Sequence, residues 1–161
     1  GADLIRSVMV LGPFMPPKIQ AKVRERASNL DTVDVLTFDS HLEILMEHAA
    51  GVVAMGGYNT FCEILSLDKP ALIMPRVAPR QEQLVRAKRA SELGVARMFD
   101  PLDETTVGSF VDALRTLPAQ SKPSTKMPTG FLDGIEKVGE LAGRHFHPTS
   151  DNHLSIVENC G

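Results

Sequence analysis

Residues 56–89 read GGYNTFCEILSLDKPALIMPRVAPRQEQLVRAKR, and this stretch decides the fold. Two glycines open it, a short amphipathic helix follows, and an apolar run at residues 71–74 (ALIM) then ends in Pro-Arg. A polar loop leads from there into a basic helix at residues 81–93. An apolar run of this kind is typical of a strand in a parallel sheet that is covered on both faces. The stretch therefore predicts an α/β protein whose strand ends meet at one edge, where open α/β sheets bind ligands.

The same alternation of strand and helix extends along the rest of the chain. Short apolar or β-branched runs predict strands at residues 7–11, 34–38, 51–55, 71–74 and 96–99. Apolar residues at helical spacing predict a helix between each pair of strands and further helices after the last one. We therefore expect an α/β fold with a parallel sheet of five to six strands and helices on both faces.

Length and proline content set the expected domain organisation. The chain has 161 residues, enough for about one domain. We expect this domain over residues 1–144, with a polar, proline-broken linker at 118–130 and a last helix at 131–142. Residues 145–161 are expected to form a flexible tail. The chain begins with Gly-Ala rather than Met, which we interpret as a domain excised from a longer protein.

Composition and motif searches argue against several classes of function. The net charge of -3 disfavours nucleic acid as a partner, because no basic field covers the domain. Two cysteines without repeated spacing give no disulfide framework and favour a cytoplasmic protein. No apolar run approaches the roughly 20 residues of a transmembrane helix. No GxGxxG, HExxH or zinc-finger spacing occurs, so we expect neither a cofactor nor a metal.

Gly56 and Gly57 are the first candidates for ligand binding. Glycine lets the backbone approach a ligand closely, and the helix that follows points its free N–H groups and positive dipole end the same way. Such a helix start is a ready site for a phosphate or diphosphate. Gly12, at the end of the first predicted strand, could frame the other side of the site. The alternative is that these glycines only form tight turns.

Glu63 lies on the helix that follows the glycine pair, where its carboxylate could accept both hydroxyls of a ribose. The alternative is a capping box, because Thr60-Phe61-Cys62-Glu63 has the sequence of one. The start of the helix decides between these two interpretations. A helix that begins at residue 57 or 58 excludes the box and leaves Glu63 able to bind.

Charged and polar side chains also gather after the strand at residues 71–74. Five basic residues against Glu82 give this region a local charge of about +4, which suits an anionic ligand; they are Arg76, Arg80, Arg86, Lys88 and Arg89. The alternative is a solvated helix face with a Glu82–Arg86 pair. Glu82 and Gln83 stand at the expected helix start and together offer acceptors and donors for sugar hydroxyls.

These residues resemble a known family. Residues 38–87, about a third of the chain, resemble the C-terminal, donor-binding domain of GT-B glycosyltransferases. The resemblance is to family 28, the branch with the lipid-II-forming N-acetylglucosaminyltransferase, and within it to a bacterial subgroup of predicted glycosyltransferases. It rests on Gly56-Gly57-Tyr58-Asn59-Thr60, Glu63, Pro70, Pro75-Arg76 and Arg80-Gln81-Glu82-Gln83.

The resemblance implies a Rossmann-like nucleotide-sugar-binding domain and a role for each matching position. The backbone of Phe38 would pair with the base, and Leu42 would cover it. Gly57 and its neighbours would hold the diphosphate, and Glu63 the ribose. Glu82 and Gln83 would contact the donor sugar, and Gly12 matches the first glycine-rich loop. The expected substrate-binding residues are therefore Gly12, Phe38, Leu42, Gly56, Gly57, Asn59, Thr60, Glu63, Arg76, Arg80, Glu82 and Gln83.

The resemblance also implies an activity, a hexosyl transfer from a nucleotide sugar to an unknown acceptor that is metal-independent and inverting. Catalytic residues are expected in an N-terminal acceptor domain of the same parent chain, so we expect this domain alone to be inactive. The parent would be a bacterial, cytoplasmic protein able to contact a membrane peripherally. Two alternatives stay open, namely half of a sugar-nucleotide epimerase and a non-catalytic binding module on the same fold.

Overall fold

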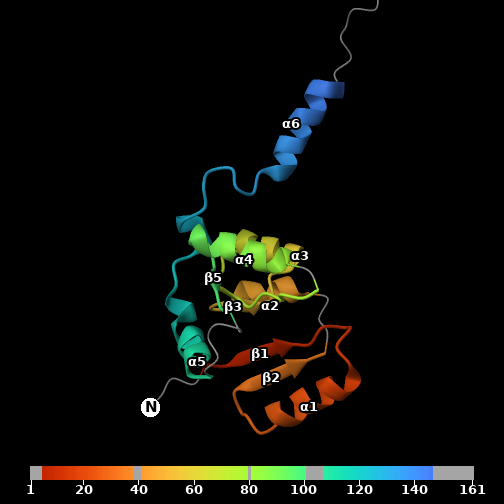
Figure 1. Ribbon diagram of the computed structural model, residues 1–161, viewed down its shortest axis with the longest axis vertical. Helices are drawn as coiled ribbons and strands as arrows, with labels where there is room; N and C mark the ends of the chain where they lie inside the picture. Colours follow the sequence, from red (N-terminus) through yellow and green to blue (C-terminus); the bar gives the residue numbers. More distant parts are fainter. Residues whose placement is uncertain (1–4, 38–40, 80, 101–106, 147–161) are drawn as a thin grey trace, which may run out of the picture. The chain divides into compact units, whose positions relative to one another are not determined.

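Strands and helices alternate along the chain, as Figure 1 shows. The computed structural model describes residues 5–37, 41–79, 81–100 and 107–146. The strands are β1 (Ser7–Val10), β2 (Val33–Leu36), β3 (Val52–Ala54), β4 (Ala71–Ile73) and β5 (Arg97–Met98). The α-helices are α1 (Pro17–Ala27), α2 (Leu42–His48), α3 (Tyr58–Ser66), α4 (Glu82–Glu92), α5 (Val107–Thr116) and α6 (Gly134–Phe146). The predicted α/β class is confirmed.

The strands pair in parallel, but they form two sheets. β1 pairs with β2, with Ser7 opposite Val33. β4 lies between β3 and β5, with Leu72 opposite both Val53 and Arg97. The expectation of one continuous sheet is therefore corrected, because no ladder of hydrogen bonds between described residues joins β1–β2 to β3–β4–β5.

Strand β4 lies in the core of its sheet. All three of its residues are buried. Ala71 and Ile73 belong to a cluster with buried side chains of α2, α3 and α4. Leu72 points to the opposite face, where it packs with Phe99 and with buried side chains of α5 and the residues after it. The expectation that this strand is covered on both faces is confirmed, and helices α3 and α4 share one of those faces (Figure 1).

The turn after α3 is fixed by Asp68, which adopts a left-handed backbone conformation with φ of 52°. Its Oδ1 accepts the backbone N–H of Ser124 at 2.8 Å, and its Oδ2 accepts the Ser124 hydroxyl at 2.9 Å. Ser124 belongs to the second of two 3₁₀ turns in this part of the chain, η1 (Leu117–Ala119), which overlaps the start of the linker predicted at residues 118–130, and η2 (Pro123–Thr125), which lies within it. Pro123 is fully buried, so this segment contributes to the packing of the domain.

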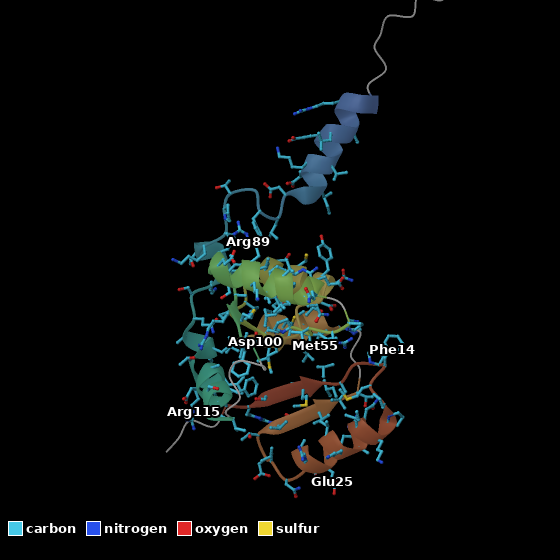
Figure 2. The ribbon with its side chains drawn as sticks, viewed as in Figure 1. Phe14, Glu25, Met55, Arg89, Asp100 and Arg115 are labelled. Carbon is cyan, nitrogen blue, oxygen red and sulfur yellow. The ribbon has the colours of Figure 1, made fainter. Side chains whose placement is uncertain are left out.

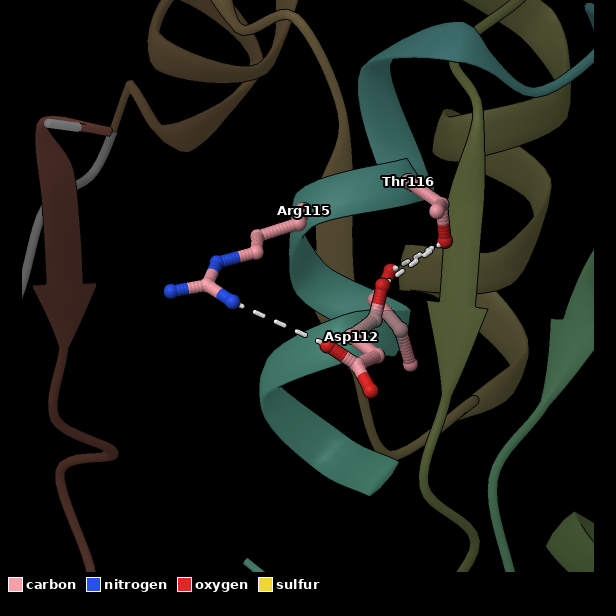
Figure 3. Close-up of polar contacts among 4 residues, drawn as sticks. Asp112, Arg115 and Thr116 are labelled. Carbon is pink, nitrogen blue, oxygen red and sulfur yellow. Dashed lines mark hydrogen bonds and ion pairs between the residues drawn. The ribbon is translucent and has the colours of Figure 1, made fainter. Parts of the chain in front are cut away.

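Helix α5 ends in a small group of polar contacts (Figure 3). The Thr116 hydroxyl donates to the Asp112 carbonyl at 2.9 Å. The same hydroxyl accepts from Arg97 Nη1 of β5 at 3.0 Å. Asp112 and Arg115 form an exposed ion pair at 3.7 Å. Exposed pairs of this kind add about 0–1 kcal/mol to stability. We therefore assign this group a structural role, the attachment of α5 to β5.

The chain divides into two compact units, Gly1–Met127 and Pro128–Gly161. Within the second unit, helix α6 begins later and ends later than the helix expected at residues 131–142. Ile135 and Val138 on this helix are exposed, at 90% and 66%. None of the helices in the described part of the chain is both long enough and apolar enough to cross a membrane.

The turn between β3 and α3 requires a glycine at one of its two positions. Gly56 is buried and has φ of +76°, and a Cβ there would lie 2.8 Å from Ile73 Cγ2. Gly57 has φ of -55°, and a Cβ there would meet nothing within 4 Å. Because a side chain at Gly56 meets both strain and a clash, Gly56→Ala is expected to lower the free energy of unfolding by about 1–3 kcal/mol. Gly57→Ala is the matched control and should change it by less than about 0.5 kcal/mol.

Urea denaturation followed by circular dichroism measures both variants. Equal midpoints for the two variants would contradict this account of the turn.

Candidate functional site

The glycine turn leads directly into the start of α3. Gly57 is the N-cap residue, and the first bond of the helix runs from the Phe61 N–H to the Gly57 carbonyl at 2.9 Å. The N–H groups of the first turn, residues 58–60, thus have no partner within the helix. Met55, the residue before the turn, is labelled in Figure 2. This is the geometry that binds phosphates at helix starts, with the positive end of the helix dipole directed outward.

The start of α3 also decides between the two interpretations of Glu63. The helix begins at Tyr58, so Thr60 lies inside the first turn and cannot act as the N-cap of a capping box. The Glu63 side chain is exposed. None of the side-chain contacts found between described residues engages its carboxylate. The capping-box alternative is therefore excluded, and Glu63 is available to a ligand.

At the end of β4, a hydrogen bond joins the following loop to α4. The Arg76 backbone N–H donates to Oε1 of Gln83 at 3.1 Å. Because a backbone N–H can only donate, this bond fixes the oxygen of the Gln83 amide toward the loop. The two N–H donors of Nε2 are left for another partner. Glu82, the first residue of α4, is exposed beside it and supplies acceptors.

A second bond joins α4 to the glycine turn. Arg86 Nη1 donates to the Gly56 carbonyl at 2.7 Å, and the guanidinium lies 5.6 Å from the centroid of the Tyr58 ring. The Glu82–Arg86 pair that the sequence allowed as an alternative is not found between these described residues. Arg86 was expected only as part of the basic region. The sequence did hold a sign that Arg86 belongs with Gln83. Arg86 follows Gln83 by three residues, and that spacing puts both side chains on one face of α4.

Two other expected site residues, Gly12 and Leu42, lie on parts of the chain other than α3 and α4. The Gly12 carbonyl accepts the Met15 N–H at 3.1 Å, in a turn that follows β1 of the other sheet. Leu42 begins α2 and packs against the core cluster around Met46. Phe38 and Arg80 lie outside the described residues.

The expected site residues on α3 are accessible. Asn59 is exposed and Thr60 is half-buried.

Farther along the neighbouring helix α4, Arg89 is exposed (Figure 2) and pairs with Glu92 at 2.9 Å. The interpretation as a solvated helix face therefore holds for Arg89. Among the described residues, no group of three or more His, Cys, Asp or Glu side chains is arranged to hold a metal ion.

Comparisons with known proteins show the family to which this chain is similar. The profile of the glycosyltransferase family 28 C-terminal domain matches residues 12–138. A Caenorhabditis elegans protein named as a UDP-glucuronosyltransferase, ugt-60, is 34% identical over 97 residues, which cover 58% of this chain and 18% of that protein.

Two solved structures share the fold. The glycosyltransferase VinC, solved with dTDP, has a TM-score of 0.61 at 25% identity over 87% of this chain and 41% of its own. MurG of Acinetobacter baumannii has a TM-score of 0.62 at 14% identity over 87% of this chain and 51% of its own. The chain thus spans about half, or less, of the proteins it matches.

The family profile covers well over half of the chain, and the fold is similar to that of GT-B glycosyltransferase domains. We conclude that the chain belongs to the glycosyltransferase family 28 C-terminal domains.

Proposed function

We propose that this chain is the donor-binding domain of a longer glycosyltransferase, which transfers a hexose from a nucleoside diphosphate sugar to an acceptor. The observation that carries the proposal is that one face of α4 bonds to two strand-end loops, through Gln83 to Arg76 and through Arg86 to Gly56. A ligand at this edge could therefore meet the free amides of α3, the Gln83 amide and the Glu82 carboxylate together. If these same groups lay at different edges of the sheet, one ligand could not contact them all.

Each part of the donor then has a partner of suitable chemistry. The N–H groups at residues 57–60 would bind the diphosphate, and Glu63 would accept the ribose hydroxyls. Glu82 and the Nε2 of Gln83 would bind the hexose. The helix dipole and Arg76 would stabilise the charge that develops on the leaving diphosphate, so the reaction needs no metal ion. An N-terminal domain of the parent protein would supply the acceptor site and the general base, for a transfer with inversion.

The nucleotide is proposed to be a pyrimidine diphosphate. The worm relative is named for UDP, and VinC was solved with dTDP. We propose a cytoplasmic location for the parent protein, which the sparse use of cysteine favours.

Calorimetric titration of the 161-residue chain with UDP and dTDP tests the proposal. We expect binding that is unchanged by EDTA. Glu63→Ala should weaken UDP binding by about 10-fold, since hydrogen bonds to a charged group contribute about 1.5–3 kcal/mol. Glu25→Ala, on the exposed surface of α1 (Figure 2), is the matched control and should leave the affinity unchanged.

If neither nucleotide binds at millimolar concentration, the proposal fails. If Glu63→Ala and Glu25→Ala bind UDP equally well, Glu63 has no role in the site and the non-catalytic module becomes the better interpretation.

Gln83 is expected to recognise the sugar through its donors. Gln83→Glu keeps an acceptor for the Arg76 N–H but replaces both donors with an acceptor, so we expect about 10-fold weaker binding of a UDP-hexose. Binding of UDP alone should change by less than about threefold. Gln81→Glu adds the same charge at the exposed N-cap of α4 and serves as the control. An equal loss for both variants would show a general charge effect and contradict the role of Gln83.

A further inference from the structure

We propose that Arg86 is a positioning residue, which holds the glycine turn so that the amides of α3 face the diphosphate. This inference rests on the proposed function and adds a residue outside the expected site. Its basis is the 2.7 Å bond from Arg86 Nη1 to the Gly56 carbonyl and the 5.6 Å contact with the Tyr58 ring. One guanidinium thus contacts both the turn and the first residue of the helix that follows.

The hydrogen bond from Arg86 to the Gly56 carbonyl lies where the backbone has few other restraints. On the strand side, the last ladder bond runs from the Met74 N–H to the Ala54 carbonyl at 2.8 Å. On the helix side, the first bond is that of the Phe61 N–H to Gly57. Gly56 lies between them in the left-handed conformation, which glycine leaves and enters at low cost. Arg86 therefore supplies a restraint on the turn that the ladder and the helix do not.

Burial distinguishes Arg86 from the other basic residues of α4. Arg86 is half-buried and directed at a backbone carbonyl, whereas Arg89 is exposed and paired with Glu92. A planar guanidinium can donate to the carbonyl and lie over an aromatic ring at the same time, which a lysine ammonium cannot do equally well. Arg86 also places its positive charge beside the start of α3, where the diphosphate is expected.

The test compares Arg86→Met with Arg89→Met, which removes the same charge from the same helix. Affinities for UDP and for uridine are measured by calorimetry or NMR titration of the 161-residue chain. We expect Arg86→Met to weaken UDP binding by about 10-fold and uridine binding by less than about twofold, because uridine lacks the diphosphate. Arg89→Met should change neither by more than about twofold, and Arg86→Lys should fall between Arg86→Met and the wild type.

Two results would overturn the inference. The first is that Arg86→Met binds UDP with the same affinity as Arg89→Met. The second is that Arg86→Met loses affinity for UDP and for uridine to the same extent, as an unfolded protein would.

Amide hydrogen exchange at residues 57–60 of the ligand-free protein gives a readout that does not need binding. We expect faster exchange there in Arg86→Met than in Arg89→Met, with unchanged exchange at Leu72 and Ile73 of β4. If the wild type binds no nucleotide but this difference is seen, the proposed function fails and the hold of Arg86 on the turn remains. Equal exchange in both variants overturns the inference even if UDP binds.

Discussion

The candidate site depends on two side chains of α4 that reach backbone groups of two different strand ends. Gln83 accepts the Arg76 N–H after β4, and Arg86 donates to the Gly56 carbonyl after β3. They stand three residues apart and so share a face of the helix. With these bonds, the loops after β3 and β4 are both joined to the same face of α4.

The apolar core supports this arrangement. β3 and β4 run in parallel and in register, with Ala54 opposite Ile73, so both strands end at the same level. Ile73 is fully buried and also limits the space at Gly56. The same residue thus links the packing of the sheet to the shape of the turn. Sites supported by packed secondary structure keep their geometry better than sites on loops alone.

Much of the fold could be predicted from residue patterns, because burial and turn chemistry act locally. The apolar run at β4 and the glycine turn before α3 are both of this kind. The partners of Gln83 and Arg86 could not be predicted, since both bond to backbone groups that every residue carries. The division into two sheets also left no signal, because it depends on whether ladders form between strands distant in sequence.

An NMR titration of the ¹⁵N-labelled chain with a UDP-hexose tests most directly whether one ligand occupies this edge. The account predicts that the backbone amides of residues 57–60 and the side-chain amide of Gln83 shift together, with the same dissociation constant. Shifts confined to one of these two groups, or centred on the surface of α5, would contradict it.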